Sequence, residues 1–207
     1  MQARIVSLIL FSLASAASAQ VGTSMGLLDA NSATEAELRA VPNVDGTVAS
    51  KIVAGRPFAS ASALDELLAA TLGEPQREQL YGRLFVTINL NTASRAEILL
   101  IPGMSDRMAH EFEEYRPYTS LEQFRREMGK YVPPGEVARL EQYVFVPMNL
   151  NNAPGAAFLT IPGMTERMVH EFEEYRPYTS FEQFRREIGK YVDDKEVARL
   201  ERYLVIE

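Results

Sequence analysis

The sequence contains no cysteine and no tryptophan, and it has only two histidines among 207 residues. Without cysteine, the chain forms no disulfide bond, no thiolate metal site and no thiol nucleophile. Positive charge is also scarce, because 21 lysines and arginines stand against 28 aspartates and glutamates, which gives a net charge of -7. Non-specific affinity for nucleic acid comes mainly from basic residues that neutralise phosphates, so this balance disfavours a general polyanion-binding protein.

Long hydrophobic runs are missing as well, apart from a short one near the N-terminus. Arg4 precedes the apolar stretch 5–13, and small residues follow it. This order is typical of a secretory signal peptide over residues 1–19, although a buried N-terminal helix would show a similar pattern. We expect cleavage between Ala19 and Gln20 and a periplasmic or secreted mature protein. We expect no membrane span in that mature chain.

The main positive feature of the sequence is an internal repeat. Residues 89–147 match residues 149–207 without a gap, at an offset of 60, and about two-thirds of the positions are identical. A weaker copy precedes them at the same offset. A fixed period of this length indicates a repeated structural unit. We therefore expect three units after the signal peptide: repeat 1 (27–86, divergent), repeat 2 (87–146) and repeat 3 (147–207).

The first half of each repeat predicts two short helices joined by a tight turn. In repeat 2, Ser94 and Glu97 have the spacing of a capping box, which starts a helix. Pro102 ends it, because the residue before proline is pushed out of the helical region. Met108 and Phe112 then place an apolar stripe on a second helix. Repeat 3 lacks the capping box, and Asn152 is the expected cap there.

The second half of each repeat predicts another pair of helices. Ser120 and Gln123 have capping-box spacing, and Gly129 is expected to end the third helix before a turn and a fourth helix. The extended segments 84–88 and 143–148 are expected to be short connectors that pack one repeat on the next. Together these signals predict an all-α fold of three units with four short helices each.

Three stretches of repeat 2 resemble a known family: Leu90 to Ser94 (LNTAS), Ile101 to Met104 (IPGM) and Tyr115 to Tyr118 (YRPY). They are similar to the tandem helix-hairpin-helix unit, a SAM-like fold, of the ComEA-like competence DNA receptors. This resemblance implies binding of double-stranded DNA through backbone contacts. The same unit is similar to the small extrinsic helix-hairpin-helix protein of photosystem II, which implies docking to a protein instead.

The turn between the first two helices is the first candidate site. In DNA-binding members of the resembled family two glycines flank a hydrophobic residue, and free amides at the next helix hold a phosphate. In this sequence the second glycine is replaced by serine or threonine, and a carboxylate follows, which would repel phosphate. The candidate DNA-binding residues of these turns are Gly103, Met104, Ser105, Arg107, Gly163, Met164, Thr165 and Arg167.

A basic patch around the second turn is the other candidate for DNA contact. Its members are Arg125, Arg126, Lys130, Arg139, Arg185, Arg186, Lys190, Lys195 and Arg199. The alternative interpretation is a solvated face in which the repeat 2 members pair with Glu122, Glu127 and Glu136.

Other functional patterns are weak. His110 and Glu111 lack the second histidine that a zinc helix requires, so we expect no metal site. The tyrosines Tyr115, Tyr118 and Tyr131 could stack on bases, but their spacing equally suits packing. No catalytic grouping is present, so we expect neither enzymatic activity nor a cofactor. Two hypotheses therefore stand. The first is binding of double-stranded DNA, the commoner role of the resembled unit, and the alternative is a docking or scaffold role in an envelope complex through the turns and the Tyr-Arg-Pro-Tyr corners.

Overall fold

The computed structural model describes residues 20–207, and the expected signal peptide lies outside them. The fold is mostly helical, as the sequence predicts, with twelve helices in the described part of the chain. In chain order the helices are Glu35–Arg39 (α1), Gly46–Gly55 (α2), Ala61–Ala69 (α3), Glu74–Tyr81 (α4), Arg95–Leu99 (α5), Asp106–Glu114 (α6), Leu121–Met128 (α7), Pro134–Glu141 (α8), Gly155–Phe158 (α9), Glu166–Glu174 (α10), Phe181–Ile188 (α11) and Asp194–Glu201 (α12).

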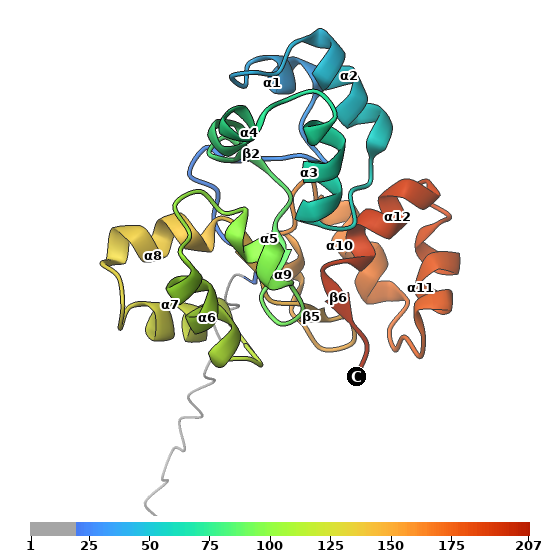
Figure 1. Cartoon of the computed structure of the whole chain (residues 1–207). Coiled ribbons are helices and arrows are strands. Elements are labelled where there is room, and N and C mark those ends of the chain that lie inside the picture. The colour runs from blue at the N-terminus through green and yellow to red at the C-terminus, as the bar shows by residue number, and fades with distance from the viewer. Residues whose placement is uncertain (1–19) are drawn as a thin grey trace, which may run out of the picture.

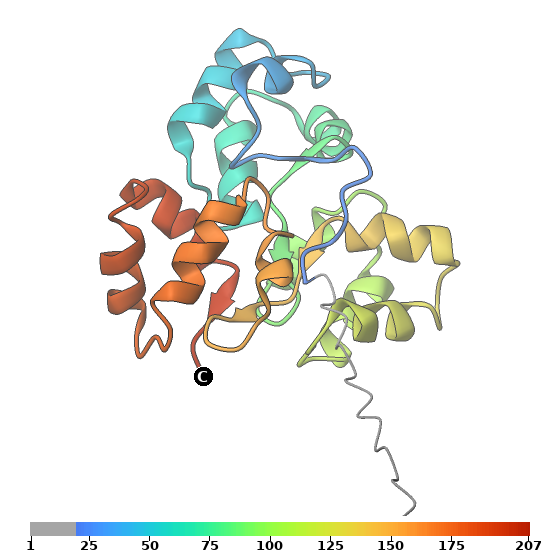
Figure 2. The ribbon, with the colours of Figure 1, turned by 180° about the vertical axis from the view of Figure 1, so that it is seen from behind.

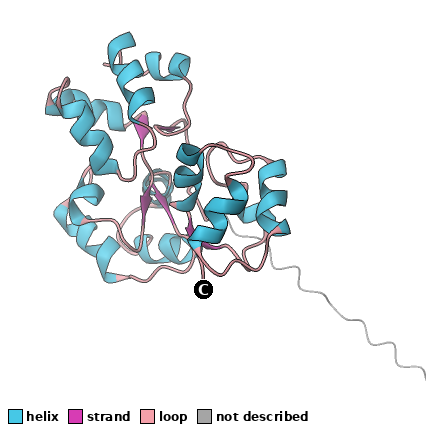
Figure 3. Ribbon diagram, turned by 90° about the vertical axis from the view of Figure 1, so that its right-hand side faces the viewer, coloured by secondary structure: helices cyan, strands magenta, loops and turns pink. Residues whose placement is uncertain are grey.

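Within residues 20–207, six two-residue strands complete the fold, which the all-α expectation omitted. They are Leu28–Asp29 (β1), Leu84–Phe85 (β2), Ile88–Asn89 (β3), Val144–Phe145 (β4), Met148–Asn149 (β5) and Leu204–Val205 (β6). Each strand at the start of a repeat pairs in parallel with the strand at its end: β1 with β2, β3 with β4 and β5 with β6. The segments expected to be plain connectors are therefore partly strands, and they tie the two ends of a repeat together near the centre of the molecule (Figure 3).

The helices form three groups around these central strands (Figure 1). Helices α1–α4 form the upper group, while α6–α8 and α10–α12 lie on opposite sides below it. One continuous hydrophobic core joins the helices of repeats 1 and 2. A second core fills repeat 3, and it also takes in Val21 and Phe145 from outside that repeat. The repeats are thus packed together by shared apolar side chains, which burial from water favours.

Helix starts follow the local sequence in most places. Thr34 and Ser94 each form the expected capping box with the glutamate three residues later. Ser120 caps α7, but the side chain of Gln123 accepts from the backbone amide of Thr119, one residue before the cap. The predicted cap of the first helix in repeat 3, Asn152, is wrong, because Pro154 is the cap residue of α9 and no side chain forms a capping hydrogen bond there.

The Arg-Pro-Tyr corner after α6 is a structural link within its repeat. The guanidinium of Arg116 donates from Nε to the carbonyl of Leu90 (2.6 Å) and from Nη2 to the carbonyl of Ala93 (2.7 Å). The side chain of Asn91 bonds both backbone groups of Tyr118, at 2.6 and 2.9 Å. Equivalent bonds occur in repeats 1 and 3. These arginines are therefore engaged inside the fold and contribute little to a docking surface.

The first described residues form a short added strand. Gly22 donates its amide to the carbonyl of Val144 (3.0 Å), and Val146 donates to the carbonyl of Gln20 (2.8 Å). Val21 forms an antiparallel bridge with Phe145, and its side chain is 3% exposed. From there the chain crosses the back of the molecule to repeat 1 (Figure 2). The start of the expected mature chain therefore helps to join repeats 2 and 3.

Candidate functional site: the helix turns and the basic patch

The turn between α5 and α6 has the backbone geometry that its sequence suggests. Gly103 has φ 74°, in the left-handed region that glycine adopts without a steric penalty. Met104 donates its amide back to the carbonyl of Ile101 (3.0 Å), which closes the turn. Ser105 caps α6 and accepts from the amide of Met108 (3.2 Å). The serine that replaces the second glycine thus occupies one amide of the helix start itself.

The equivalent turn of repeat 3 lies against repeat 1. Gly163 has φ 77°, and a Cβ placed on it would lie 3.8 Å from the Cβ of Ser32. Arg199 donates from Nη1 to the carbonyl of Pro162 (2.6 Å), and its side chain is only 4% exposed. A pocket of about 560 Å³ lies between this turn and the residues around Asp29. Arg199, expected in the basic patch, therefore supports the turn from inside.

The turn of repeat 2 also faces repeat 1, and the facing surface is acidic. A pocket of about 290 Å³ is lined by residues 99–104 on one side and by residues of α3 and α4 on the other. Asp65, Glu74 and Glu78 contribute carboxylates to this pocket. Arg77 is their one cation there, and it is bonded to Asp65 at 2.7 Å. Carboxylates so close to the turn would repel a nucleic-acid phosphate.

The remaining turn candidates divide into buried and exposed side chains. Met104 and Met164 are half-buried and pack against the two cores. Arg107 and Arg167 are exposed, as is Thr165, which caps α10 as Ser105 caps α6. Within residues 20–207 the two arginines form no ion pair. They are the free cations closest to the turns.

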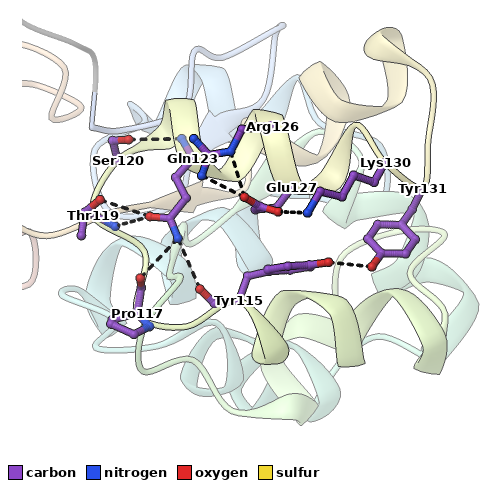
Figure 4. A network of polar contacts seen from close by, with 9 residues as sticks. All are labelled: Tyr115, Pro117, Thr119, Ser120, Gln123, Arg126, Glu127, Lys130 and Tyr131. Carbon is purple, nitrogen blue, oxygen red and sulfur yellow. Dashed lines mark hydrogen bonds and ion pairs between the residues drawn. The ribbon is translucent and has the colours of Figure 1, made fainter.

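Most of the basic patch is paired with carboxylates. Arg125 binds Glu141 through two nitrogens, at 2.5 and 2.8 Å. Arg126 and Lys130 both bind Glu127, which they flank in Figure 4. These hydrogen bonds from Lys130 and Arg126 lower the pKa of Glu127, so that carboxylate remains ionised. Most of this local positive charge is therefore balanced before any ligand arrives.

The other members of the patch repeat these contacts. Arg139 binds Glu136 at 2.6 Å. In repeat 3 the pairs are Arg185 with Glu201, Arg186 and Lys190 with Glu187, and Arg199 with Glu196. Lys195 is exposed and has no ion pair within the described residues. The proposed partner Glu122 takes no part, and Glu141 takes its place in the pairing.

The tyrosines separate into a surface pair and a core residue. The hydroxyls of Tyr115 and Tyr131 share a hydrogen bond of 2.7 Å (Figure 4), and the ammonium of Lys130 lies 4.7 Å from the centre of the Tyr115 ring. That hydrogen bond raises the pKa of Tyr131. Tyr118 is 1% exposed and cannot stack on a base. Repeat 3 has the same pair, Tyr175 with Tyr191 at 2.9 Å.

The described residues lack both a cluster suited to a metal ion and a helix suited to crossing a membrane. Within residues 20–207, no group of three or more histidine or carboxylate side chains is placed to hold a metal ion. His110 lies 3.6 Å from Glu114 on the exposed side of α6. In the same part of the chain, no helix combines the length and apolar character that crossing a bilayer requires.

Two features of the site were not anticipated from the sequence. The Arg125 to Glu141 pair joins residues 16 apart on different helices, at a spacing that helical periodicity does not reveal. The approach of repeat 1 to both turns depends on how the repeats pack. Comparison with known proteins adds no independent assignment, because no family model, curated protein or solved structure matches this chain.

Proposed function

We propose that the protein is an exported, non-enzymatic module of three tandem helix-hairpin-helix units, and that it docks another protein of the cell envelope. The ComEA-like resemblance of the sequence supports the unit assignment. The observation that carries the docking role is a set of apolar side chains exposed at equivalent positions of repeats 2 and 3. Leu99 and Leu159 are 39% and 43% exposed, and Tyr131 and Tyr191 are both 37% exposed.

The equivalent positions of repeat 1 lack these side chains. Arg39 lies 60 residues before Leu99, and Thr71 lies 60 residues before Tyr131. Two exposed apolar side chains recur at the same positions of repeats 2 and 3, and we take these recurring positions as the contacts of a docked partner. A surface present twice on one chain also supports two-point attachment, which strengthens binding through a high effective concentration.

A second candidate, binding of double-stranded DNA, is favoured by exposed cations at equivalent places in repeats 2 and 3. The side chains of Arg126 and Arg186 are 66% and 65% exposed, and those of Lys130 and Lys190 are both 52% exposed. We rank this role second, because each pair of cations shares one glutamate and because acidic residues face the turn of repeat 2. Long-range attraction to phosphate falls off within about 10 Å in moderate salt.

The docking proposal is tested by capture of a partner from the envelope fraction of the host. Mature wild-type protein is compared with a Leu99→Glu, Leu159→Glu double variant, and we expect the variant to lose the captured protein. Val53→Glu is the matched control, because Val53 is 38% exposed but lies in repeat 1. Equal recovery with all three proteins would show that these leucines do not dock a partner.

The DNA candidate is tested in parallel with duplex DNA across a salt series. Binding through phosphates weakens steeply as salt increases, roughly in proportion to the number of phosphates neutralised. We expect the protein not to bind the duplex, even at the lowest salt concentration of the series. Tight binding there, weakened by an Arg126→Ala, Arg186→Ala double variant, would instead establish the DNA role.

A further inference from the structure

Strands β2, β4 and β6 end the three repeats. The outer edge of each, which is the side away from the strand that it pairs with, is covered differently. In repeat 1, the closing segment from Leu84 to Val86 is fully buried, with no residue more than 1% exposed. In repeat 2, residues 20–22 cover the edge of β4 as an added antiparallel strand. In repeat 3, no strand within residues 20–207 pairs with β6 other than β5. Among the residues that the structure describes, the edge of β6 is therefore the one of the three that lacks a cover of either kind.

Side-chain exposure agrees with this difference. Phe145 and Val146 on the covered strand are 1% and 3% exposed. Their counterparts 60 residues later, Val205 and Ile206, are only half-buried. Figure 1 shows β6 beside the last residues of the given sequence. An uncovered strand edge presents unpaired backbone groups that readily take up another extended segment.

The covered edge shows which backbone groups are available on the open one. Residues 20–22 use the carbonyl of Val144 as acceptor and the amide of Val146 as donor. The equivalent groups of repeat 3 are the carbonyl of Leu204 and the amide of Ile206. The parallel ladder of repeat 3 uses the carbonyls of Tyr203 and Val205 on the other side. Alternation along a strand directs the groups of Leu204 and Ile206 away from β5.

The covered edge also shows what sequence such a segment must have. Val21 packs into the core of repeat 3, and within residues 20–207 no further repeat supplies such a core beside β6. At β6 a β-branched residue is favoured only because it suits the extended backbone of an added strand. A Cβ on Gly22 would lie 1.8 Å from the carbonyl oxygen of Glu141, so only glycine fits there. Glu201 is the counterpart of Glu141 in repeat 3 and ends α12 in the same way.

We propose that the outer edge of β6 binds an extended segment of a partner protein, in which a β-branched residue is followed by glycine. The segment adds to β6 as an antiparallel strand, in the way that residues 20–22 add to β4. Addition of a strand to a sheet edge is a general mode of peptide recognition, in which backbone bonds give affinity and side-chain positions give specificity. The edge of β6 is a site separate from the exposed leucines and tyrosines, so this inference goes beyond the proposed docking function and its peptide test does not depend on that function.

The probe for this site is the six-residue peptide QVGTSM, which copies residues 20–25. Mature protein from Gln20 keeps its own segment on β4, so the added peptide is free to occupy the edge of β6. We expect saturable changes in the backbone NMR signals of Leu204 and Ile206 at peptide concentrations up to about 1 mM, the range of weak peptide binding. Absence of saturable changes at these residues would overturn the proposal.

Two variants make the test specific. Ile206→Pro removes the donated N–H, and we expect peptide affinity to fall about fivefold, the effect of one lost hydrogen bond. Ile206→Val keeps the N–H and should bind within about twofold of wild type on the same reasoning. A peptide with valine in place of glycine should lose binding altogether, and this arm needs no change to the protein. Equal binding of the glycine and valine peptides would overturn the proposal.

The partner-capture experiment then separates this proposal from the docking function. Loss of the captured protein with Ile206→Pro, but not with Ile206→Val, supports docking through β6. Retention of the captured protein with Ile206→Pro refutes docking through β6 while the docking function stands. Failure of wild-type protein to capture any partner counts against the docking function, and the peptide titration still tests the edge.

Discussion

Asp29 is the residue whose replacement most directly tests the packing between repeats 1 and 3. Its Oδ1 accepts from the amide of Asn31 (3.0 Å), whereas its Oδ2 is buried and has no hydrogen-bond partner within the described residues. Burial raises the pKa of this carboxyl, although Arg202 and Arg199 nearby act in the opposite direction. The ionised carboxylate is therefore less favourable in the folded protein than in the unfolded chain.

The other two repeats have a neutral residue at the same place. Asn89 and Asn149 each accept from the amide two residues later at 2.9 Å, so asparagine preserves the turn that Asp29 forms. An Asp29→Asn substitution should keep that bond and replace the buried carboxylate oxygen with an uncharged NH2 group, which also lacks a partner. The gain therefore comes from removing the buried negative charge, and at pH 7.5 we expect about 1.4 kcal/mol for each unit by which burial raises the pKa of Asp29. For a chain of this length, the melting temperature should rise by about 2 to 4 °C for each kcal/mol.

The pH dependence gives a sharper test than stability at a single pH. The pKa of Asp29 is raised in the folded state, so the ionised side chain lowers the free energy of unfolding. Above the folded pKa, wild type is therefore less stable than Asp29→Asn by the full amount. The deficit shrinks as pH falls through the folded pKa, and it vanishes below the unfolded pKa of about 3.9. Urea unfolding of both proteins between pH 7.5 and pH 4 would measure this difference, since other groups titrate equally in both.

The control for Asp29 is Glu78→Gln, which also removes one negative charge but from an exposed position on α4. We expect this control to show no comparable gain. If Asp29→Asn were less stable than wild type at pH 7.5, the attraction of Asp29 to Arg202 would outweigh its burial. The carboxylate of Asp29 would then hold repeats 1 and 3 together, and its burial would not be a net cost to the fold.

Four other predictions concern the fold. Arg116→Lys should destabilise the protein by about 2 to 4 kcal/mol in urea unfolding, because an ammonium cannot reproduce two bonds from one guanidinium to two carbonyls; no loss would show that these bonds are dispensable. Val21→Ala should lower the free energy of unfolding by about 1 to 3 kcal/mol, measured by thermal unfolding. Gly22→Val should release the strand of residues 20–22, which would be detected as faster hydrogen exchange of the Val146 amide. Glu127→Gln should flatten the loss of stability between pH 5 and pH 2, because the lowered pKa of Glu127 makes its contribution disappear as pH falls through that value.

The parts of the structure that are local in sequence could be predicted, and the reasons are physical. A capping box such as Ser94 with Glu97 depends on groups three residues apart, so its sequence pattern is sufficient. The turn at Gly103 follows from proline and glycine, whose backbone preferences are strong. The short strands were missed, since two-residue strands such as β3 have too little length for an alternating pattern to emerge.

The parts that depend on packing between repeats could not be predicted. Arg199 looks like a surface cation in the sequence, and only the fold shows that it is 4% exposed and bonded to Pro162. Its counterpart Arg139 is 31% exposed, although the two local sequences are similar. The difference arises because the turn of repeat 3 lies beside Ser32 of repeat 1. A pattern within one repeat contains no information about its neighbour.

The divergence of repeat 1 is explained by the same packing. Repeats 2 and 3 share an ion pair between α7 and α8 or α11 and α12, exemplified by Arg125 with Glu141. At the equivalent positions repeat 1 has Asp65 and Tyr81, whose side chains hydrogen-bond each other, so the charge at the first position is reversed. Asp65 then faces the turn at Gly103 together with other carboxylates of α4. Repeat 1 thus has an acidic side chain, where repeats 2 and 3 have arginine, at the place where it packs against the turn of repeat 2.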